Sequence, residues 1–381
     1  LKNTNVIERL SKIDTAIFDK TGTLTTNQKD TIHYEGMELT EEETALLKTT
    51  LKALKKVNRT TCIEGAPGGG KTTIIHEVAK ELDVHYIERH MPTSMVEDFG
   101  IPDVLGSVAE ESGVKSFNYV MPDWFPAKGS RYDDGRGGIL CFDDRNQAGA
   151  DLQKVMANIC QARNLHGIEI ADDWMIVSTG NRATDRAGAQ RVLSHLRNRE
   201  TVLELETNLN DSTSWMAANG VKGEVISFLR FKSNLLHDFD PQRDANPTPR
   251  SWVEGVSDVL GVIPGEAEFE AFKGAVGEGA AAEFRAFVKI WRELPNVDNV
   301  LMHPDTHEIP TDPAVLYALS GSIAERAEEG NFSRVCTFFE REEMPAEFSV
   351  LAISLATRRN PKLAQTEALA NWAVKHQDVL F

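Results

Sequence analysis

Cysteine is rare in this chain of 381 residues, which has only four, at positions 62, 141, 160 and 336. They form no C-x-x-C pair and no cluster with histidine at zinc-site spacing, so the sequence predicts no zinc domain. Scattered free thiols are expected in a reducing compartment. No run of 18 or more apolar residues occurs, which argues against a membrane span. Because no signal-peptide pattern is present either, we expect a cytoplasmic protein.

Basic charge is also in short supply, with 41 Lys and Arg against 58 Asp and Glu and a net charge of −17. Neutralisation of phosphates by basic side chains supplies most non-specific affinity for nucleic acid. A broad nucleic-acid-binding face is therefore not expected, although a local basic channel in an oligomer stays open. The hydrophobic share of 41% is ordinary for a globular protein, and the length allows two or three domains.

The most informative segment, residues 65–72, reads GAPGGGKT and matches the phosphate-binding pattern G-x-x-x-x-G-K-[ST]. Its glycines allow successive backbone N–H groups to turn inward around a triphosphate. A β-prone run at 60–64 precedes the loop and a run with helical spacing at 73–82 follows it, so the helix N-terminus would face the same phosphates. We expect Lys71 to reach the β- and γ-phosphates of ATP and Thr72 to hold Mg²⁺. The residues expected around the nucleotide are Gly65, Ala66, Pro67, Gly68, Gly69, Gly70, Lys71, Thr72 and Thr73.

Two further apolar runs end in polar residues suited to ATP chemistry. The run at 138–142 leads to Asp143 and Asp144 and predicts a strand buried on both faces, with the acids at its carboxyl end. In a P-loop enzyme the first acid would bind Mg²⁺ through water and the second would polarise the attacking water. The run at 174–179 leads to Asn181, which would contact the γ-phosphate or that water. An ordinary turn asparagine is the alternative.

Clustered arginines follow at 191, 197 and 199. They are either surface charge or include an arginine finger, which stabilises transition-state charge across a subunit interface. Their spacing alone does not choose among Arg191, Arg197 and Arg199.

With these residues in place, the chain from about 41 to 381 resembles an AAA+ ATPase of the MoxR/CbbQ-like, dynein-related branch. Residues 65–72, GAPGGGKT, resemble its Walker A motif. Residues 139–148, ILCFDDRNQA, are similar to its Walker B motif, hhhhDEhNRA, and residues 178–181, STGN, resemble its sensor 1, A-T-x-N. Asp144 stands where glutamate is usual, and its shorter side chain places the water differently or slows hydrolysis.

Two arginine-bearing segments complete the resemblance. Residues 195–199, HLRNR, resemble the element A-L-x-x-R-F, which assigns the finger to Arg199. Glu200 replaces the usual phenylalanine and leaves Arg197 as a competing choice. Residues 248–251, TPRS, resemble the S-P-R sensor 2 of the helical lid, which makes Arg250 a nucleotide-sensing residue. The resemblance implies an ATP-driven hexameric ring that remodels a client protein, often with a partner that carries a von Willebrand A-type domain.

Residues 1–28 resemble something different, the phosphorylation segment of a P-type ATPase. Residues 19–25 read DKTGTLT, and Asp19 matches the aspartate that accepts phosphate in that family. The other P-type motifs and the transmembrane helices are missing, so Asp19 lacks a site in which to react. We interpret the segment as a fusion or graft without chemistry of its own.

The organisation expected from these motifs is an α/β fold with a P-loop AAA+ core and a parallel sheet, followed by helices. The P-type-like segment covers 1–30 and the nucleotide-binding core 31–207. A helical lid covers 208–265, and an α-helical C-terminal extension covers 266–381.

Aromatic residues raise two questions about packing. Trp124 and Phe125 lie in a long insertion at 91–138, where they would be either pore-loop residues that grip a substrate or locally packed residues, the reading we favour. The stripe of Phe269, Phe272, Phe284, Phe287 and Trp291 predicts a contact between helices.

The sequence thus predicts an ATP-hydrolysing oligomer that remodels a protein client. The rivals are a nucleic-acid motor of phage type, a nucleotide-binding switch with little turnover, and a phosphotransferase built on Asp19. The mixed charge of the candidate pore loop counts against the first. The client, the ring size and the pore residues are not encoded in any motif that we can name.

Overall fold

The computed structural model describes residues 41–103, 109–111, 114–116, 118–182 and 192–375. The chain divides into two units, residues 1–38 and 39–381, and the second is described here. The P-type-like segment with Asp19 lies outside the described residues, as does Arg191.

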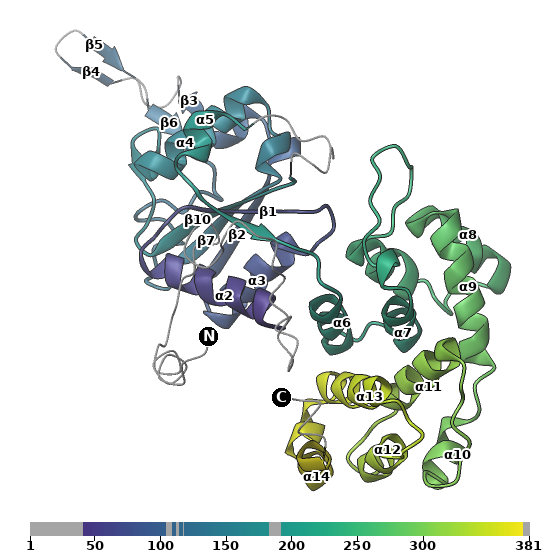
Figure 1. The fold of residues 1–381 in the computed structure, drawn as a ribbon. Helices are drawn as coiled ribbons and strands as arrows, with labels where there is room; N and C mark the ends of the chain where they lie inside the picture. The colour runs from purple at the N-terminus through teal and green to yellow at the C-terminus, as the bar shows by residue number, and fades with distance from the viewer. Residues whose placement is uncertain (1–40, 104–108, 112–113, 117, 183–191, 376–381) are drawn as a thin grey trace, which may run out of the picture. The chain divides into compact units, whose positions relative to one another are not determined.

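A five-stranded parallel sheet forms the centre of the N-terminal half, in the order β11-β1-β10-β7-β2 (Figure 1). The strands are β1 (Thr61–Gly65), β2 (His85–His90), β7 (Gly138–Asp143), β10 (Trp174–Gly180) and β11 (Thr201–Leu205). β10 lies between β1 and β7 and pairs with both. Because all five strands run the same way, the P-loop, the acids after β7 and the polar residues after β10 lie at one edge of the sheet.

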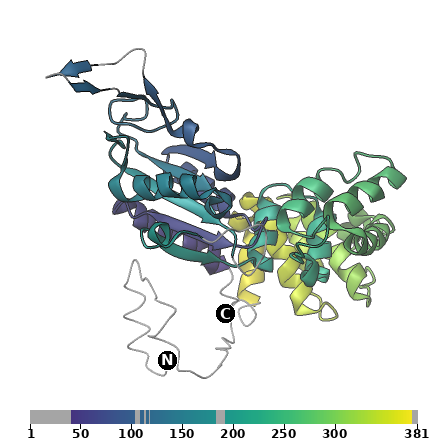
Figure 2. The same cartoon turned by 90° about the horizontal axis from the view of Figure 1, so that it is seen from above.

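Helices cover both faces of the sheet (Figures 1 and 2). On one face α2 (Glu41–Lys56) and α3 (Lys71–Glu81) pack on an apolar cluster that includes Ile139 and Cys141 of β7. On the other, α4 (Ala150–Ala162) packs on a cluster that includes Leu140 and Phe142. Alternate residues of β7 therefore enter different clusters, as expected for a strand buried on both faces.

The insertion between β2 and β7 contains two short 3₁₀ turns, Met91–Thr93 and Val96–Phe99, and four short strands. The strands are β3 (Ile101–Asp103), β4 (Ala109–Glu111), β5 (Val114–Ser116) and β6 (Asn118–Val120). The Trp124 indole N–H donates to the Asp98 carbonyl, the Trp124 ring packs edge-on against Phe99, and Phe125 is buried. Local packing of the two aromatics, rather than a role in gripping substrate, matches the reading that we favoured.

All regular secondary structure in residues 209–375 is helical. The helices are α6 (Leu209–Ala218), α7 (Gly223–Phe231), α8 (Gly265–Val276), α9 (Glu278–Arg292), α10 (Val297–Met302), α11 (Pro313–Glu325), α12 (Phe332–Phe339), α13 (Ala346–Arg359) and α14 (Glu367–Lys375), with a π-helical segment at Ser251–Ser257. One apolar cluster contains residues from Met216 to Trp372. It therefore includes residues on both sides of position 265, where the sequence analysis placed the end of the lid. The aromatic stripe lies in α8 and α9, with Phe272, Phe284 and Phe287 buried, so its prediction as a helix–helix contact is confirmed.

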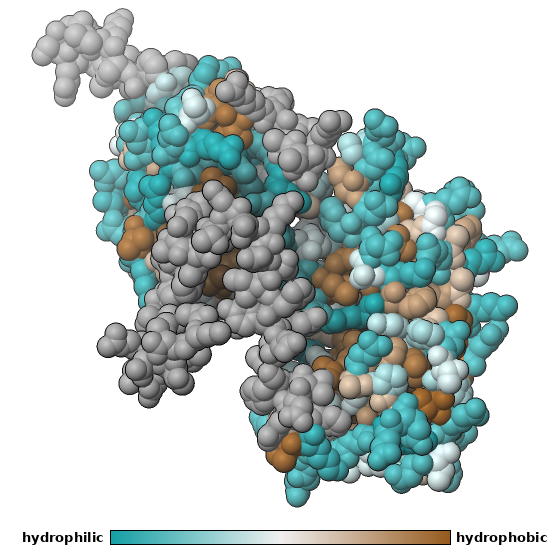
Figure 3. Space-filling model, in the orientation of Figure 1, coloured by the Kyte–Doolittle hydropathy of each residue, from teal (hydrophilic) through white to brown (hydrophobic). Residues whose placement is uncertain are grey.

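The fold class predicted from the sequence, an α/β core with a parallel sheet followed by helices, is confirmed. None of the helices in the described part of the chain combines the length and apolar character needed to cross a bilayer. Figure 3 shows hydrophilic residues over most of the visible described surface, with apolar residues scattered among them.

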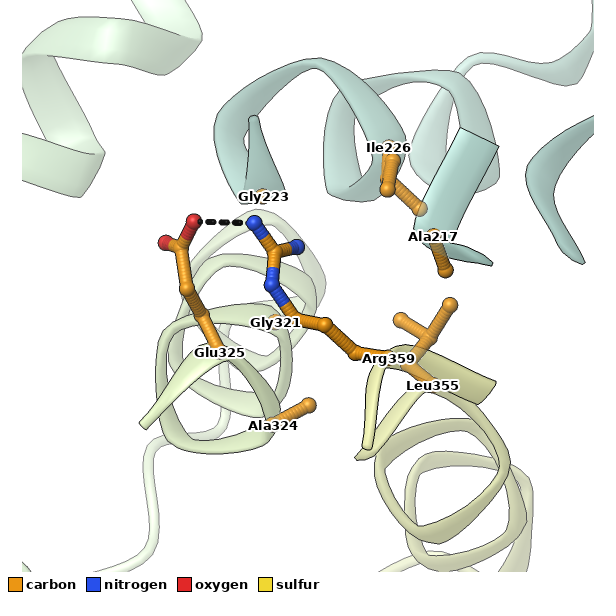
Figure 4. Close-up of a pocket in the computed structure, with 8 residues that line it drawn as sticks. All are labelled: Ala217, Gly223, Ile226, Gly321, Ala324, Glu325, Leu355 and Arg359. Atoms are coloured by element: carbon orange, nitrogen blue, oxygen red, sulfur yellow. Dashed lines mark hydrogen bonds and ion pairs between the residues drawn. The ribbon is translucent and has the colours of Figure 1, made fainter. Parts of the chain in front are cut away.

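Small residues allow α7 and α11 to pack closely (Figure 4). A side chain on Gly321 of α11 would lie 1.8 Å from Ser227 Oγ of α7, 3.1 Å from Ser227 Cβ and 3.2 Å from the Trp291 ring. The same figure shows Arg359 of α13 reaching Glu325 of α11, at 2.9 Å between Nη2 and Oε1. The contact between α7 and α11 thus depends on the absence of a side chain at position 321.

Gly321→Ala is expected to lower the free energy of unfolding, by about 1–3 kcal/mol for an overpacked core. Rotation of the Ser227 hydroxyl relieves the shortest contact, but Ser227 Cβ and the Trp291 ring remain within 3.2 Å. Gly274→Ala is the matched control, because a Cβ at that helical position meets nothing within 4 Å. The control should raise stability by about 0.5–1 kcal/mol, since alanine favours helix. Equal denaturant midpoints for the two variants would contradict this account of the packing.

All four cysteines are buried and unbonded, and burial raises the pKa of the Cys62 and Cys336 thiols to about 12. Only the thiolate reacts with disulfide reagents, so the native protein at pH 8 should show almost no reactive thiol. In denaturant all four should react. A thiol that reacts rapidly in the native state would show that its cluster opens locally.

Candidate functional site

The loop between β1 and α3 has the backbone of a phosphate-binding turn. Gly68 and Gly70 adopt left-handed φ angles of 70° and 85°, which glycine reaches without strain. A side chain on Gly65 would lie 2.7 Å from the Leu205 carbonyl oxygen of β11, so the loop begins close against the neighbouring strand. Gly70 precedes the first turn of α3, whose free N–H groups and dipole favour an anion.

Lys71 is buried, with 7% of its surface exposed. Its ammonium donates to the carbonyls of Gly65 and Ala66, at 3.1 and 3.0 Å, and to Asn181 Oδ1 at 2.9 Å. A buried cation held by neutral oxygens beside a left-handed glycine turn fits a multiply charged anion. The structure therefore joins Lys71 and Asn181, which lie 110 residues apart in the sequence.

Thr72 and Asp143 meet on the same edge of the sheet. The Thr72 hydroxyl donates to Asp143 Oδ1 at 2.8 Å, and the Thr179 hydroxyl donates to the same oxygen at 2.7 Å. The Thr179 oxygen also accepts from the Asp144 backbone N–H at 2.9 Å. Hydroxyl and carboxylate oxygens are the ligands that Mg²⁺ prefers, so Thr72 and Asp143 fit this ion. Thr179 fixes both acids at once.

Asp144 lies half-buried next to Asp143 with a left-handed backbone, φ 53° and ψ 45°. Aspartate and asparagine adopt this conformation more readily than most residues. Burial raises the pKa of the Asp144 carboxyl, and the neighbouring charge of Asp143 adds to the rise. A carboxylate whose pKa is raised towards neutrality is a better acceptor of a proton from water.

Asn181 is positioned by its own pair of hydrogen bonds. The Asn146 side-chain amide donates to the Asn181 carbonyl at 2.6 Å, and Asn146 Oδ1 accepts from the Asn181 backbone N–H at 3.3 Å. This exchange ties the segment after β7 to the end of β10. The Asn181 side chain is thereby directed to Lys71 rather than into solvent.

The candidate finger residues differ in what they contact. Arg199 donates to the Ala157 carbonyl of α4 at 2.8 Å, so it is bound within its own core. Arg197, on the short helix α5 (Ser194–Arg197), has 59% of its side chain exposed and lies 3.9 Å from Glu64. Sequence reasoning assigned the finger to Arg199. Because a finger acts across a subunit interface, the assignment to Arg199 stays a prediction.

A cavity of about 380 Å³ adjoins the P-loop. Its walls include Gly68, Gly69, Gly70, Thr73 and Arg250, so the predicted lid arginine lies beside the phosphate loop. Such a volume is typical of a small-ligand site.

Two hydrogen bonds join the elements that line this cavity. The Thr44 hydroxyl donates to Asp211 Oδ2 at 2.7 Å, and the Trp215 indole N–H donates to Glu77 Oε1 at 2.7 Å. Both bonds connect α6 with helices of the sheet region, so they hold the cavity walls together.

Several site residues were not foreseen from the sequence. His90, at the end of β2, forms with Asp143 and Asp144 a group of possible metal ligands whose atoms lie within 4.8 Å of one another. Arg358, at the end of α13, also lines the cavity. Thr179 was part of the sensor 1 match but had no assigned role. Only the neighbouring sheet strands bring His90 and Thr179 to the acids, and no local motif marks Arg358.

Comparison with known proteins gives a limited result. No family model and no curated protein matches the chain. Solved structures that align with it include NtrX from Brucella abortus, with 14% identity, a TM-score of 0.36, and coverage of 90% of this chain and 68% of that one. A mutant RuvB from Thermotoga maritima aligns with 16% identity, a TM-score of 0.35, and coverage of 82% and 87%. NtrX from Brucella abortus in complex with ATP aligns with 13% identity and a TM-score of 0.34, and the alignment covers 91% of this chain and 69% of that one.

Proposed function

We propose that this chain binds ATP with Mg²⁺ and hydrolyses it, as an AAA+ ATPase of the MoxR/CbbQ-like branch. The observation that carries the proposal is the meeting of Lys71, Thr72, Asp143 and Asn181 around a left-handed glycine turn. These residues come from three separate parts of the chain. A structural role alone does not require a buried lysine, a hydroxyl–carboxylate pair and an amide at one sheet edge.

Each residue then has a chemical role. Lys71 neutralises the β- and γ-phosphates, and Thr72 and Asp143 hold Mg²⁺, which supplies charge neutralisation on the transferred phosphoryl group. Asp144 orients the attacking water and takes up its proton. Asn181 contacts the γ-phosphate or that water, and Arg250 reports the nucleotide to the helical lid.

The oligomeric part of the proposal comes from the arginines. A P-loop site of this kind is completed by an arginine supplied from the same chain or from another subunit. In the described residues, Arg199 faces α4 and Arg197 faces outward. We therefore infer a homo-oligomeric ring, hexameric by resemblance, that applies ATP-driven shape change to a protein client. A partner with a von Willebrand A-type domain is the candidate class.

Steady-state phosphate release tests the enzymatic part. Purified protein with ATP and Mg²⁺ should turn over, and removal of the cation with EDTA should abolish turnover. Turnover that persists in EDTA would contradict the roles of Thr72 and Asp143. Titration with a fluorescent ATP analogue measures binding in parallel. A loss of hydrolysis can therefore be distinguished from a loss of affinity.

A nucleotide-dependent switch with little turnover is the second candidate. It is favoured by Asp144, whose side chain is one methylene shorter than the usual glutamate and also accepts a hydrogen bond from Gln147 at 3.2 Å. Tight ATP binding with no phosphate release in the same assays would support the switch over the motor.

A further inference from the structure

A buried ionic cluster lies beneath the segment that carries the candidate fingers. Arg145, directly after Asp144, and Glu200, directly before β11, both have completely buried side chains and lie 3.1 Å apart. Arg145 also donates to Glu64 Oε1 at 3.0 Å and to Ser178 Oγ at 3.1 Å. The Ser178 hydroxyl in turn donates to Glu200 Oε1 at 2.5 Å.

The cluster connects the parts of the site that surround the phosphate loop. Glu64 is the last residue of β1 before Gly65 of the P-loop, and Ser178 lies on β10 next to Thr179. Arg145 follows Asp143, the last residue of β7, and Asp144. Glu200 follows α5 by three residues. Side chains from β1, from β10 and from the turn after β7 therefore contact Arg197 or Glu200.

A buried ionic cluster is not an efficient source of stability. Removing two charges from water is costly, and apolar residues of similar volume often serve as well or better. Arg145 Nη1 is buried with no hydrogen-bond partner among the described residues, so the network is not even fully satisfied. Glu200 stands where the motif resembled by this segment carries phenylalanine. A buried ion pair at such a position can fix the orientation of the segments that it joins.

The arginines show which orientation is fixed. Arg199 is held by the Ala157 carbonyl within its own core, whereas Arg197 is 59% exposed and its guanidinium lies 3.9 Å from Glu64. Glu64 thus contacts Arg145 on its buried side and faces Arg197 on its exposed side. The charge of Glu64 limits the directions in which Arg197 can extend.

We propose that the Arg145–Glu200 pair, with Glu64, is a positioning device that presents Arg197 to the ATP site of a second copy of this chain. The inference rests on the proposed function, because it requires an ATP site completed by a neighbour. It assigns the trans-acting role to Arg197 and a holding role to Arg199. Arg145 and Glu200 act through Arg197 and do not touch the nucleotide.

Assemblies that mix variant and wild-type subunits test the surface that presents Arg197 separately from the ATP site. Subunits with Lys71→Met cannot hydrolyse ATP but still present their arginines to wild-type neighbours. An excess of these donors is mixed with wild-type protein, and phosphate release is measured per wild-type subunit. The Lys71→Met donor is compared with donors that also carry Arg197→Ala, Glu200→Gln or Arg199→Lys.

The Lys71→Met donor should support wild-type sites, and so should the donor with Arg199→Lys. Loss of a finger costs about 10³-fold or more, so the Arg197→Ala donor should reduce the wild-type rate to near zero. Misplacement by about 1 Å costs up to about 100-fold, so Glu200→Gln should reduce the rate at least about tenfold. Affinity of the wild-type subunits for a fluorescent ATP analogue should not change.

A donor with both Arg145→Met and Glu200→Met separates positioning from folding. We expect this apolar pair to give a melting temperature equal to or above that of the Lys71→Met donor, while donor function stays lost. Full donor function with Glu200→Gln, or with the double methionine variant, would overturn the proposal, as would failure of Arg199→Lys alone. If the wild-type rate is the same with every donor at all ratios, the ATP site is not completed by a second subunit. That result would contradict the oligomeric part of the proposed function, and this inference with it.

Discussion

Asp144→Asn is expected to lower kcat for ATP hydrolysis by about 100-fold or more, while ATP still binds. Loss of a positioned general base typically costs about 10²–10⁴-fold. Asparagine has the same size and tolerates the left-handed backbone found here, so the loop should keep its shape. Removal of a negative charge beside Asp143 should leave nucleotide affinity equal or slightly higher. Phosphate release and titration with a fluorescent ATP analogue measure the two effects separately.

Asp83→Asn is the matched control for this change. Asp83 has nearly the same backbone angle, φ 51°, and is exposed in the turn after α3. It should hydrolyse ATP at the wild-type rate. Asp144→Glu is informative as well, because the longer acid reaches further while glutamate adopts this backbone less readily. Undiminished hydrolysis by Asp144→Asn would show that another group activates the water.

Lys71→Met is expected to weaken ATP binding and to remove turnover. Methionine keeps the length and burial of the side chain but removes the charge that would meet the phosphates. Hydrogen bonds to charged groups contribute about 1.5–3 kcal/mol each, which corresponds to about 10- to 100-fold in affinity for one lost bond. Ligand binding stabilises a fold by about 2.7 kcal/mol at one hundred times Kd. At the same ATP concentration the stabilisation should therefore fall to about 0.4–1.4 kcal/mol, and the ATP-induced rise in melting temperature should shrink accordingly.

Lys80→Met controls for the loss of a lysine from the same helix. Lys80 lies on α3 and is exposed, so its replacement should leave the ATP-induced rise unchanged. Lys71→Met also leaves the Gly65 and Ala66 carbonyls and Asn181 without their donor, which is expected to cost about 1–3 kcal/mol without nucleotide. An unaltered ATP-induced rise in Lys71→Met would contradict the assignment of the P-loop as the nucleotide site.

The sequence was sufficient to predict those parts of the structure that are marked by a contiguous segment. The glycine turn, the strand ending in Asp143 and the strand leading to Asn181 each carry a local pattern, and parallel strands bring such ends to one edge. The α/β class followed from the same patterns. Boundaries were less sharp. The helix that begins at Gly223 ends at Phe231 and a 3₁₀ turn follows at Ser233–Leu235, although the apolar spacing of the sequence continues to Leu236.

Contacts between distant segments were beyond the reach of the sequence. The order of the strands places Thr179 against both acids and places His90 opposite Asp143. No spacing rule gives that order. Arg199 was chosen from a motif, whereas its bond to the Ala157 carbonyl depends on how α4 packs. The pairing of Arg145 with Glu200 likewise joins residues 55 positions apart, neither of which has a role in isolation.

We propose above that ATP is hydrolysed at a site completed by a second copy of the chain. The most direct measurement is the specific rate of Mg²⁺-dependent phosphate release over a wide range of protein concentration, with the oligomeric state followed in the same samples. We predict that the rate per subunit rises with concentration and saturates as the assembly forms. A constant rate that persists where the protein is monomeric would contradict the claim, as would bound ATP with no turnover at any concentration.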